Sequence, residues 1–152
     1  MTDPTPLSQR RLRTWIRLLR LTRRSENHLR EFLRVNYNTT LPRFDVMAAL
    51  HRNKTPMKMS ELSRMLLVSN GNATAVIDRL KKDGFATRTQ VKTDRRVVEV
   101  QLTDQGRIQF EIQAAAHEAE VNKLFSDLGD DELDALRDML KHTKGDGDDD
   151  YD

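Results

Sequence analysis

The first forty residues contain the longest amphipathic pattern of the chain. Neither glycine nor proline interrupts residues 8–37, and apolar side chains recur there at spacings of three and four, which is the period of an α-helix. The recurring positions include Leu12, Trp15 or Ile16, Leu19, Leu29 and Leu33. Further apolar residues widen this face beyond what a lone surface helix needs. The pattern predicts one long helix with apolar surface to spare.

Three shorter helical patterns follow. After a break around residues 36–43, Pro42 suits the first turn of a helix that runs to Asn53. Ser60 is a candidate N-cap for a short helix, and another helix covers about residues 70–82 and stops at Gly84. The inward-facing positions expected in these last two helices are Leu62, Met65, Leu66, Ala73, Val76, Ile77 and Leu80. Two short helices joined by a few residues are typical of a helix-turn-helix.

Between Phe85 and Leu102 the period changes to two, which indicates a β-hairpin with a basic tip at residues 92–95. Thr103 then caps a long helix that ends at Gly129, and Asp130 starts a last helix. The predicted fold class is therefore mainly α with a small β-hairpin wing. The order of elements is that of a winged helix-turn-helix with N- and C-terminal dimerisation helices.

This order divides one structural domain into four parts. Residues 1–38 form an N-terminal dimerisation helix, 39–102 the winged helix-turn-helix DNA-binding region, 103–143 the C-terminal dimerisation helices, and 144–152 a disordered acidic tail. Only 37% of the residues are hydrophobic, whereas 33% are charged. We expect a second copy of the chain to cover the remaining apolar surface, which predicts a homodimer.

Charge is distributed unevenly along the 152 residues. The net charge of +2 is the sum of +9 in residues 1–58, +3 in residues 59–102 and −10 in residues 103–152. A basic front and an acidic back indicate a polyanionic partner at one end of the sequence.

Composition excludes several classes of site. Without cysteine the chain has no disulfide, thiolate zinc site or cysteine nucleophile. The four histidines show no metal-ligand spacing, and we expect neither a metal nor a cofactor. No apolar run approaches the ~20 residues that span a bilayer, and the start lacks the pattern of a signal peptide. We therefore expect no membrane association and a cytoplasmic location.

Three segments together resemble one family. The run from Asp94 through Arg96 to Leu102, Thr103 and Gly106 is similar to the Asp-x-Arg…Leu-Thr-x-x-Gly signature of MarR-type transcriptional regulators. Residues 59–66 and 70–85 resemble the two DNA-binding helices of that family. The resemblance covers nearly the whole chain in order. It implies a ligand-responsive repressor that binds double-stranded DNA, as a dimer, at a pseudo-palindromic operator.

The helix over residues 70–82 is the candidate recognition helix. With its apolar face inside, it offers small and polar side chains to base edges, where Asn suits adenine, Arg suits guanine and methyl groups suit thymine. The candidate DNA-reading residues are Ser69, Asn70, Asn72, Thr74, Ala75 and Arg79. The alternative interpretation of this segment is a solvated helix face capped by Asn.

The hairpin tip supplies a second candidate contact with DNA. The family resemblance implies that Arg96 enters the minor groove and that Asp94 holds its guanidinium group in place. A narrow minor groove concentrates negative potential, which favours an inserted arginine. Lys92 and Arg95 then contact phosphates. The alternative is an ordinary solvated turn.

Nine arginines lie between residues 10 and 34, and Arg13, Arg17, Arg20 and Arg24 fall on one helical stripe. Three interpretations remain open: a solvated face that also attracts DNA, ion pairs with the acidic C-terminal half, or a binding site for an anionic effector. Arginine favours planar carboxylate or phosphate recognition. The candidate effector-binding residues are Trp15, Arg17, Leu19, Arg20, Arg24, Arg43, Phe44, Met47 and His51.

Residues 18–24, 40–50 and 68–72 look like the branch of the family that responds to hydroxycinnamoyl-CoA thioesters. That resemblance implies a repressor of aromatic-acid catabolism that the thioester releases from DNA. A regulator of efflux or stress genes that senses a simple phenolic carboxylate is the alternative. An enzyme acting on CoA esters is a further alternative, although no nucleophile–base pair or phosphate-cradling glycine loop supports it, and a helical adaptor that does not bind DNA leaves the basic hairpin unexplained.

Overall fold

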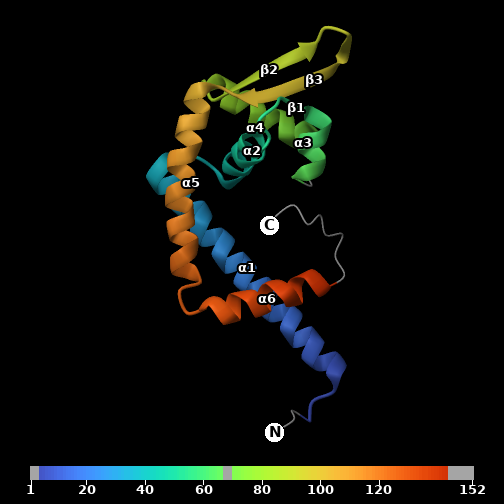
Figure 1. Ribbon diagram of the computed structural model, residues 1–152, viewed down its shortest axis with the longest axis vertical. Helices are drawn as coiled ribbons and strands as arrows, with labels where there is room; N and C mark the ends of the chain where they lie inside the picture. The colour runs from blue at the N-terminus through green and yellow to red at the C-terminus, as the bar shows by residue number, and fades with distance from the viewer. Residues whose placement is uncertain (1–3, 67–69, 144–152) are drawn as a thin grey trace.

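The computed structural model describes residues 4–66 and 70–143, and it has the predicted fold class. Helices surround a small antiparallel sheet at one end of the molecule (Figure 1). The elements are α1 (Leu7–Tyr37), α2 (Leu41–Arg52), β1 (Met57–Lys58), α3 (Met59–Met65), α4 (Asn70–Lys82), β2 (Ala86–Val91), β3 (Asp94–Leu102), α5 (Asp104–Leu124) and α6 (Asp130–His142).

The sheet has one strand more than the predicted hairpin. Its order is β1-β3-β2, with every neighbouring pair antiparallel, and Met57 of β1 pairs with Val100 of β3. The prediction missed β1 because a strand of two residues shows no alternation. This strand connects the segment before α3 to the wing, so that the helix-turn-helix and the hairpin share one sheet.

Local signals explain where several elements begin and end. The Thr40 hydroxyl accepts a hydrogen bond from the backbone N–H of Arg43 at 3.3 Å, and the Thr103 hydroxyl accepts one from Gly106 at 2.9 Å. Gly84 follows α4 with φ of +82°, a conformation that glycine adopts without steric cost. The predicted boundaries near Pro42, Gly84 and Thr103 are thereby confirmed.

The prediction was wrong at α3. Ser60 is not its N-cap, because the helix begins at Met59 after Lys58, and the Lys58 backbone N–H donates to the Glu61 carboxylate at 3.3 Å. Met65 was also predicted to face inward, but it is the last residue of this seven-residue helix and is 42% exposed, whereas Leu62, one turn earlier, is fully buried.

The prediction was also wrong about the end of α5. The helix ends at Leu124, five residues before Gly129, and a turn follows in which the Leu128 N–H donates to the Phe125 carbonyl. Gly129 is the N-cap of α6 and donates its N–H to the Glu132 carboxylate at 3.0 Å. The glycine therefore starts the next helix. The predicted disordered tail, residues 144–152, lies outside the described residues.

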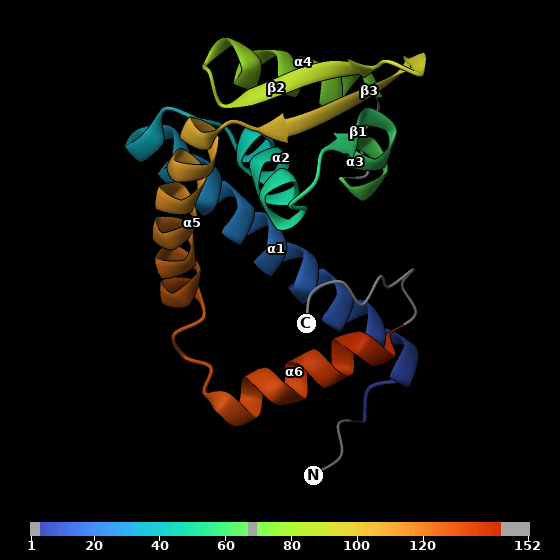
Figure 2. The same ribbon diagram turned by 45° about the horizontal axis from the view of Figure 1, so that its top comes forward.

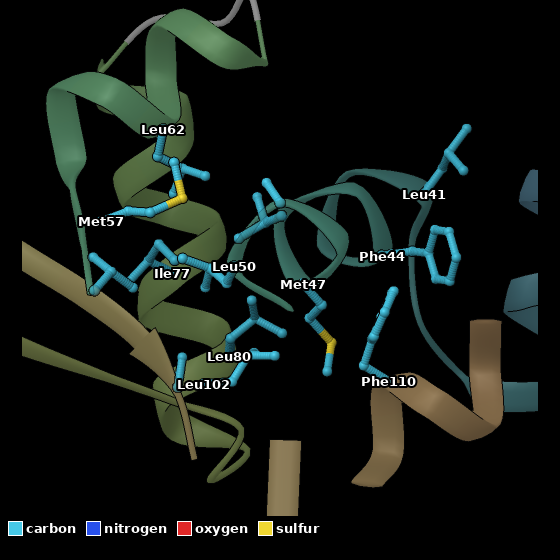
Figure 3. Close-up of a cluster of buried hydrophobic side chains, with 14 of the residues drawn as sticks. Leu41, Phe44, Met47, Leu50, Met57, Leu62, Ile77, Leu80, Leu102 and Phe110 are labelled. Carbon is cyan, nitrogen blue, oxygen red and sulfur yellow. The ribbon is translucent and has the colours of Figure 1, made fainter. Parts of the chain in front are cut away.

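The core lies in the winged region. Leu62 of α3, Ile77 and Leu80 of α4 and Val100 of β3 are fully buried side by side. Figure 3 shows this cluster continuing along α2 through Leu50 and Met47 to Phe44, which meets Phe110 of α5. The core thus fixes α4 against the sheet and joins α5 to the winged region.

The helices α1 and α5 run away from the winged region, and α6 lies at their far end (Figure 2). Two histidine–glutamate contacts link α5 to the rest of the chain. His28 of α1 lies 2.8 Å from Glu120, and His51 of α2 lies 3.1 Å from Glu111. None of the described helices combines the length and apolar character that a membrane span requires.

Candidate DNA-binding surface

The two faces of α4 have different neighbours. Ala73, Ile77 and Leu80 are buried against the core, as predicted, while Asn72 and Ala75 lie exposed on the outer side. Their spacing of three residues places these two side chains next to each other on the helix surface. The outer face of α4 is therefore fixed by the burial of its inner face.

The remaining candidate residues of this segment occupy other places. Thr74 is half-buried, and Arg79 lies on the outer side, where its Nε is 3.3 Å from a carboxylate oxygen of Asp83. Arg88 of β2 pairs with Asp78 of α4 at 3.2 Å. Ser69 and the side chain of Asn70 lie outside the described residues. The carboxylates of Asp78 on α4 and of Asp83 just after its end are thus paired with arginines.

The wing is a hairpin with a two-residue turn. Lys92 and Thr93 form the turn, and a register irregularity at Gln90 and Val91 lets Val91 pair with Asp94. The turn is therefore shorter than the predicted tip at residues 92–95, because Asp94 and Arg95 already belong to β3. In both views the hairpin tip projects beyond the helices (Figures 1 and 2).

Asp94 and Arg96 are in contact at the base of this turn. An Asp94 carboxylate oxygen accepts hydrogen bonds from the Arg96 backbone N–H at 3.1 Å and from its guanidinium Nε at 3.3 Å. The Arg96 side chain is nevertheless 92% exposed. The carboxylate thus orients a guanidinium group whose outer nitrogens are available to a partner.

The predicted effector residues fall into two groups within one chain. Phe44 and Met47 are buried in α2, and Arg43 and His51 are half-buried nearby. Trp15 is 58% exposed on the other half of α1, eighteen positions before the buried Leu33, which corresponds to roughly 27 Å of helix. Arg17, Leu19 and Arg20 accompany Trp15 on that half, whereas Arg24 lies just past the middle of α1. Within one chain, Trp15 and its neighbours therefore lie at a distance from the group on α2.

An aromatic cluster surrounds Phe44. His117 of α5 stacks on Phe44 with ring centroids 4.5 Å apart, and Phe110 lies 5.4 Å from Phe44 and 4.9 Å from His51. Burial lowers the pKa of His117 because it disfavours the charged imidazolium. The cluster thus joins α2 to α5 around a histidine whose neutral form is favoured.

The side-chain oxygen of Gln113 faces the same region without a hydrogen-bond partner among the described residues. Gln113 is 2% exposed and lies on α5 between Phe110 and His117, one turn from each. Neither Gln113 nor His117 was among the candidate site residues predicted from the sequence. Their spacing of three and four residues from Phe110 is the signal that places them on one helix face.

The arginine stripe of α1 is exposed. Within the described part of the chain, Arg17, Arg20 and Arg24 form no ion pair, whereas His28 of α1 pairs with Glu120 of α5. Glu120 has a lowered pKa because Lys123 and then His28 hydrogen bond to it. The described residues contain no group of three side chains suited to hold a metal ion.

Comparison with known proteins shows which family the chain belongs to. The MarR family model matches residues 39–98, which include α2, α3, α4, β2 and most of the wing. An uncharacterised HTH-type transcriptional regulator of Bacillus subtilis, YkoM, is 34% identical over 117 residues, covering 77% of this chain and 74% of that protein.

Solved structures of MarR-type regulators have a similar fold. A mutant of MarR from E. coli complexed with operator DNA is 25% identical, covers 90% of this chain and 97% of its own, and superposes with a TM-score of 0.75. Sco3205 from Streptomyces coelicolor, in complex with DNA, superposes with a TM-score of 0.80 at 20% identity, covering 93% and 89% of the two chains. These relatives are transcriptional regulators and not enzymes. The chain belongs to the MarR family of winged helix-turn-helix transcriptional regulators.

Proposed function

We propose that the chain is a homodimeric, ligand-responsive repressor that binds double-stranded operator DNA through α4 and the wing. The observation that carries this proposal is the exposed Arg96 held by Asp94. Both residues belong to β3, which lies at the same end of the molecule as α4 (Figure 2). A recognition helix and an oriented arginine on one side of a domain can contact the major and the minor groove of one duplex.

In the major groove, the outer face of α4 supplies the base contacts. The amide of Asn72 suits adenine, because its oxygen can accept a hydrogen bond from adenine N6–H₂ while its NH₂ group donates to N7. The methyl group of Ala75 suits the methyl of thymine. The rigid packing of Ile77 and Leu80 supports this role, since it holds the helix in one orientation.

At the wing, Arg96 enters the minor groove and Lys92 and Arg95 contact phosphates. The contact with Asp94 supports this assignment, because a guanidinium group that is already oriented loses less conformational freedom on binding. The phosphate contacts of Lys92 and Arg95 fix the position of the wing on the DNA backbone, whereas Arg96 responds to the width of the minor groove.

A second copy of the chain covers the exposed apolar side chains of the terminal helices. Large apolar side chains remain exposed on α1, α5 and α6 in one chain, which a soluble monomer rarely tolerates in such number. They are Leu7, Leu12, Trp15, Ile16, Leu18, Leu21, Val35, Ile108, Ile112, Leu133, Met139 and Leu140. The two-fold axis of the dimer then places two copies of α4 about one helical turn, ~34 Å, apart on the duplex.

The groove between α5 and α6 is where the partner's α1 packs. Its volume is about 740 Å³, and Val121, Phe125, Leu133 and Leu136 contribute its apolar lining. The first turn of α6 carries three carboxylates, whereas α1 is rich in arginine. Opposite charge beside matching apolar surface supports α1 as the occupant.

The effector is an aromatic acid or its CoA thioester, with hydroxycinnamoyl-CoA favoured, and the regulated function is aromatic-acid catabolism. The cluster of Phe44, His51 and His117 supports an aromatic group, and the unpartnered oxygen of Gln113 offers an acceptor to a phenolic hydroxyl. The arginine stripe of α1 offers cations to the phosphates of CoA. A simple phenolic carboxylate acting on efflux or stress genes is the second candidate, because it needs the cluster and only one or two cations.

Release from DNA requires the effector to bind the DNA-free state more tightly. A ligand shifts an equilibrium only by its differential affinity for the two states. The aromatic cluster joins α5 to the winged region, so that an occupant there changes the position of α4 relative to the dimer helices. Two recognition helices that are wrongly spaced no longer fit one operator.

Selection of bound duplexes from a random pool tests the DNA-binding proposal. We expect a pseudo-palindrome whose half-sites lie one helical turn apart. With Asn72→Ala, the selected base at one position of each half-site is expected to change. A uniform loss of affinity for all sequences would mean that Asn72 touches only phosphate.

Titration of the operator complex with hydroxycinnamoyl-CoA and with the free acid tests the effector. Neutralising Arg17, Arg20 and Arg24 together to Gln is expected to weaken the effect of the thioester and to leave that of the free acid unchanged. An unchanged titration with the thioester would contradict the role of the arginine stripe. Release by the free acid alone would favour the phenolic-carboxylate sensor.

A further inference from the structure

A hollow of about 500 Å³ lies beside α4, where the end of α1 and the start of α2 approach it. Four arginines from three helices contribute to its wall. They are Arg30 and Arg34 of α1, Arg43 of α2 and Arg79 of α4. Apolar atoms of Leu41, Pro42 and Val76 complete the lining. The sequence analysis considered Arg43 and Arg79 for different roles, and the fold brings them to one place.

The hollow retains positive charge after its internal contacts are counted. Arg34 makes two hydrogen bonds to Glu31, at 2.6 and 3.0 Å, and these lower the pKa of that carboxyl group. Asp83 holds Arg79. Among the described residues Arg30 donates only to the neutral amide of Asn27, at 2.9 Å, and it has no carboxylate partner there.

Arg43 is the second arginine of the hollow without a carboxylate partner among the described residues. It forms no ion pair with the rest of the described chain, although it is half-buried. The backbone N–H of Arg43 donates to the Thr40 hydroxyl at the start of α2. The partial positive charge of this helix end adds to the positive potential of the hollow. The four guanidinium groups and two carboxylates therefore leave a net charge of about +2 at a concave site.

The hollow adjoins the surface proposed to contact DNA. Ala75 and Arg79 belong both to the outer side of α4 and to the wall of the hollow. The major groove is about 12 Å wide and a helix is about 10–12 Å across, so a helix in the groove has one sugar-phosphate strand along each flank. The wing tip projects at the opposite side from the corner of α1 and α2 (Figure 2).

We propose that this hollow holds a backbone phosphate of the bound operator, on the flank of α4 away from the wing tip. The inference rests on the proposed DNA binding and adds a contact surface to it. Arg30 and Arg43 donate to the phosphate oxygens, because guanidinium groups match phosphate geometry in pairs. Arg79 then positions the backbone and does not read guanine. The apolar lining at Pro42 and Val76 accommodates the deoxyribose.

The salt dependence of DNA binding tests the proposal. Each phosphate contact contributes about 0.9 to the slope of log K against log salt concentration. A dimer has two hollows and so holds two phosphates, and the double variant Arg30→Gln with Arg43→Gln is expected to reduce this slope by about 1.8, equally on the selected operator and on an unrelated duplex. Far-UV circular dichroism and sedimentation first establish that helix content and oligomeric state match the unmodified protein.

The matched control removes the same charge elsewhere on the same helix. Arg11→Gln with Arg13→Gln changes two exposed arginines that lie roughly 26 Å along α1 from Arg30. At 0.15 M salt the Debye length is about 8 Å, so this control is expected to keep the slope of the unmodified protein. If the double variant of the hollow fails to fold, Arg30→Gln alone carries the test, because Arg30 makes one exposed hydrogen bond, and its expected reduction is about 0.9.

Three results would overturn the proposal. One is a slope for the hollow variant equal to that of the unmodified protein or of the control. Another is a loss confined to the operator sequence, which would assign these arginines to base reading. The third is a site for free pyrophosphate, detected by calorimetry, that the variant loses while its DNA slope stays unchanged. Absence of DNA binding by the unmodified protein is a separate result, which would refute the proposed function itself.

Discussion

The winged region and the terminal helices differ in how completely one chain buries their apolar side chains. In the winged region Leu62, Ile77 and Val100 are shielded from solvent by neighbours of the same chain. On α6 no residue is buried, and Met139 is 65% exposed. Trp15 on α1 is exposed to a similar degree. The winged region therefore buries its apolar side chains within one chain, whereas the terminal helices leave apolar surface exposed.

Charge follows the same division. In the winged region the acidic groups on α4 and β3 are paired locally, as in the contacts of Asp78 with Arg88 and of Asp94 with Arg96. The arginine stripe of α1 has no such partners among the described residues, and the acidic first turn of α6 is equally exposed. Under the proposed function, one chain therefore carries a complete contact surface for DNA, whereas assembly and effector binding require a second copy.

The largest expected effect is a cavity in the winged core. Ile77→Ala removes a fully buried side chain and is expected to lower the free energy of unfolding by about 2–5 kcal/mol. Urea denaturation followed by circular dichroism measures this change. A matched replacement at the surface, Met65→Ala, is expected to cost much less because that side chain is exposed. Equal losses at both sites would break the distinction between core and surface in this region.

A change on α1 should act on assembly instead. Trp15→Asp places a charge on the exposed apolar stripe and is expected to raise the dimer dissociation constant by about 30-fold or more, which corresponds to about 2 kcal/mol. Sedimentation equilibrium over a range of concentrations measures it, with Arg13→Asp as the control on the polar side. A dimer of unchanged affinity would show that this stripe is not the interface.

The wing arginine should affect DNA binding alone. Arg96→Ala is expected to weaken operator binding by about 1–3 kcal/mol and to leave helix content and dimerisation intact. Fluorescence anisotropy with a labelled duplex measures the loss. Thr93→Ala, in the turn beside it, serves as the control with little effect. Normal operator affinity in the Arg96 variant would refute the assignment of the wing.

The smallest expected effect is a dependence of stability on pH at the junction of α2 and α5. His117 has a lowered pKa in the folded protein because burial disfavours its charged form. The unfolded chain, in which the pKa of histidine is about 6.5, therefore binds more protons in this range. Stability is full above that pH and falls as the pH drops through 6.5.

Comparison of the unmodified protein with His117→Phe isolates this group. The histidines that pair with Glu111 and Glu120 are present in both proteins, and the lowered pKa of Glu120 acts only below about pH 4.5. Thermal unfolding at pH 7.5 and pH 5.5 should show a smaller decrease in the variant. An equal or larger decrease in the variant would contradict the assignment to His117.

Periodicity and capping residues predicted most of the winged region. The alternation before Leu102, the cap at Thr103 and the stop at Gly84 each act within a few residues, so the sequence displays them directly. The strand β1 was not predicted, because two residues are too few to show the alternation of a strand. Gly129 was misassigned because a glycine that starts one helix looks the same as one that ends another.

The candidate sites show the same limit. The Asp94–Arg96 contact joins residues two apart and could be expected from a motif. The hollow joins Arg30 to Arg79, which are forty-nine positions apart, and only the packing of α1 against the winged region brings them together. The unpartnered oxygen of Gln113 was equally hidden, because burial of a polar group depends on its neighbours in space.

Counting the chains on one selected operator duplex tests the central claim most directly. Sedimentation velocity of the complex, at salt concentrations that suppress non-specific binding, measures that number. We predict two chains on each pseudo-palindromic duplex, with no intermediate of one chain, and a strong loss of affinity for an isolated half-site. A single chain bound to a half-site with the affinity of the full operator would contradict the account.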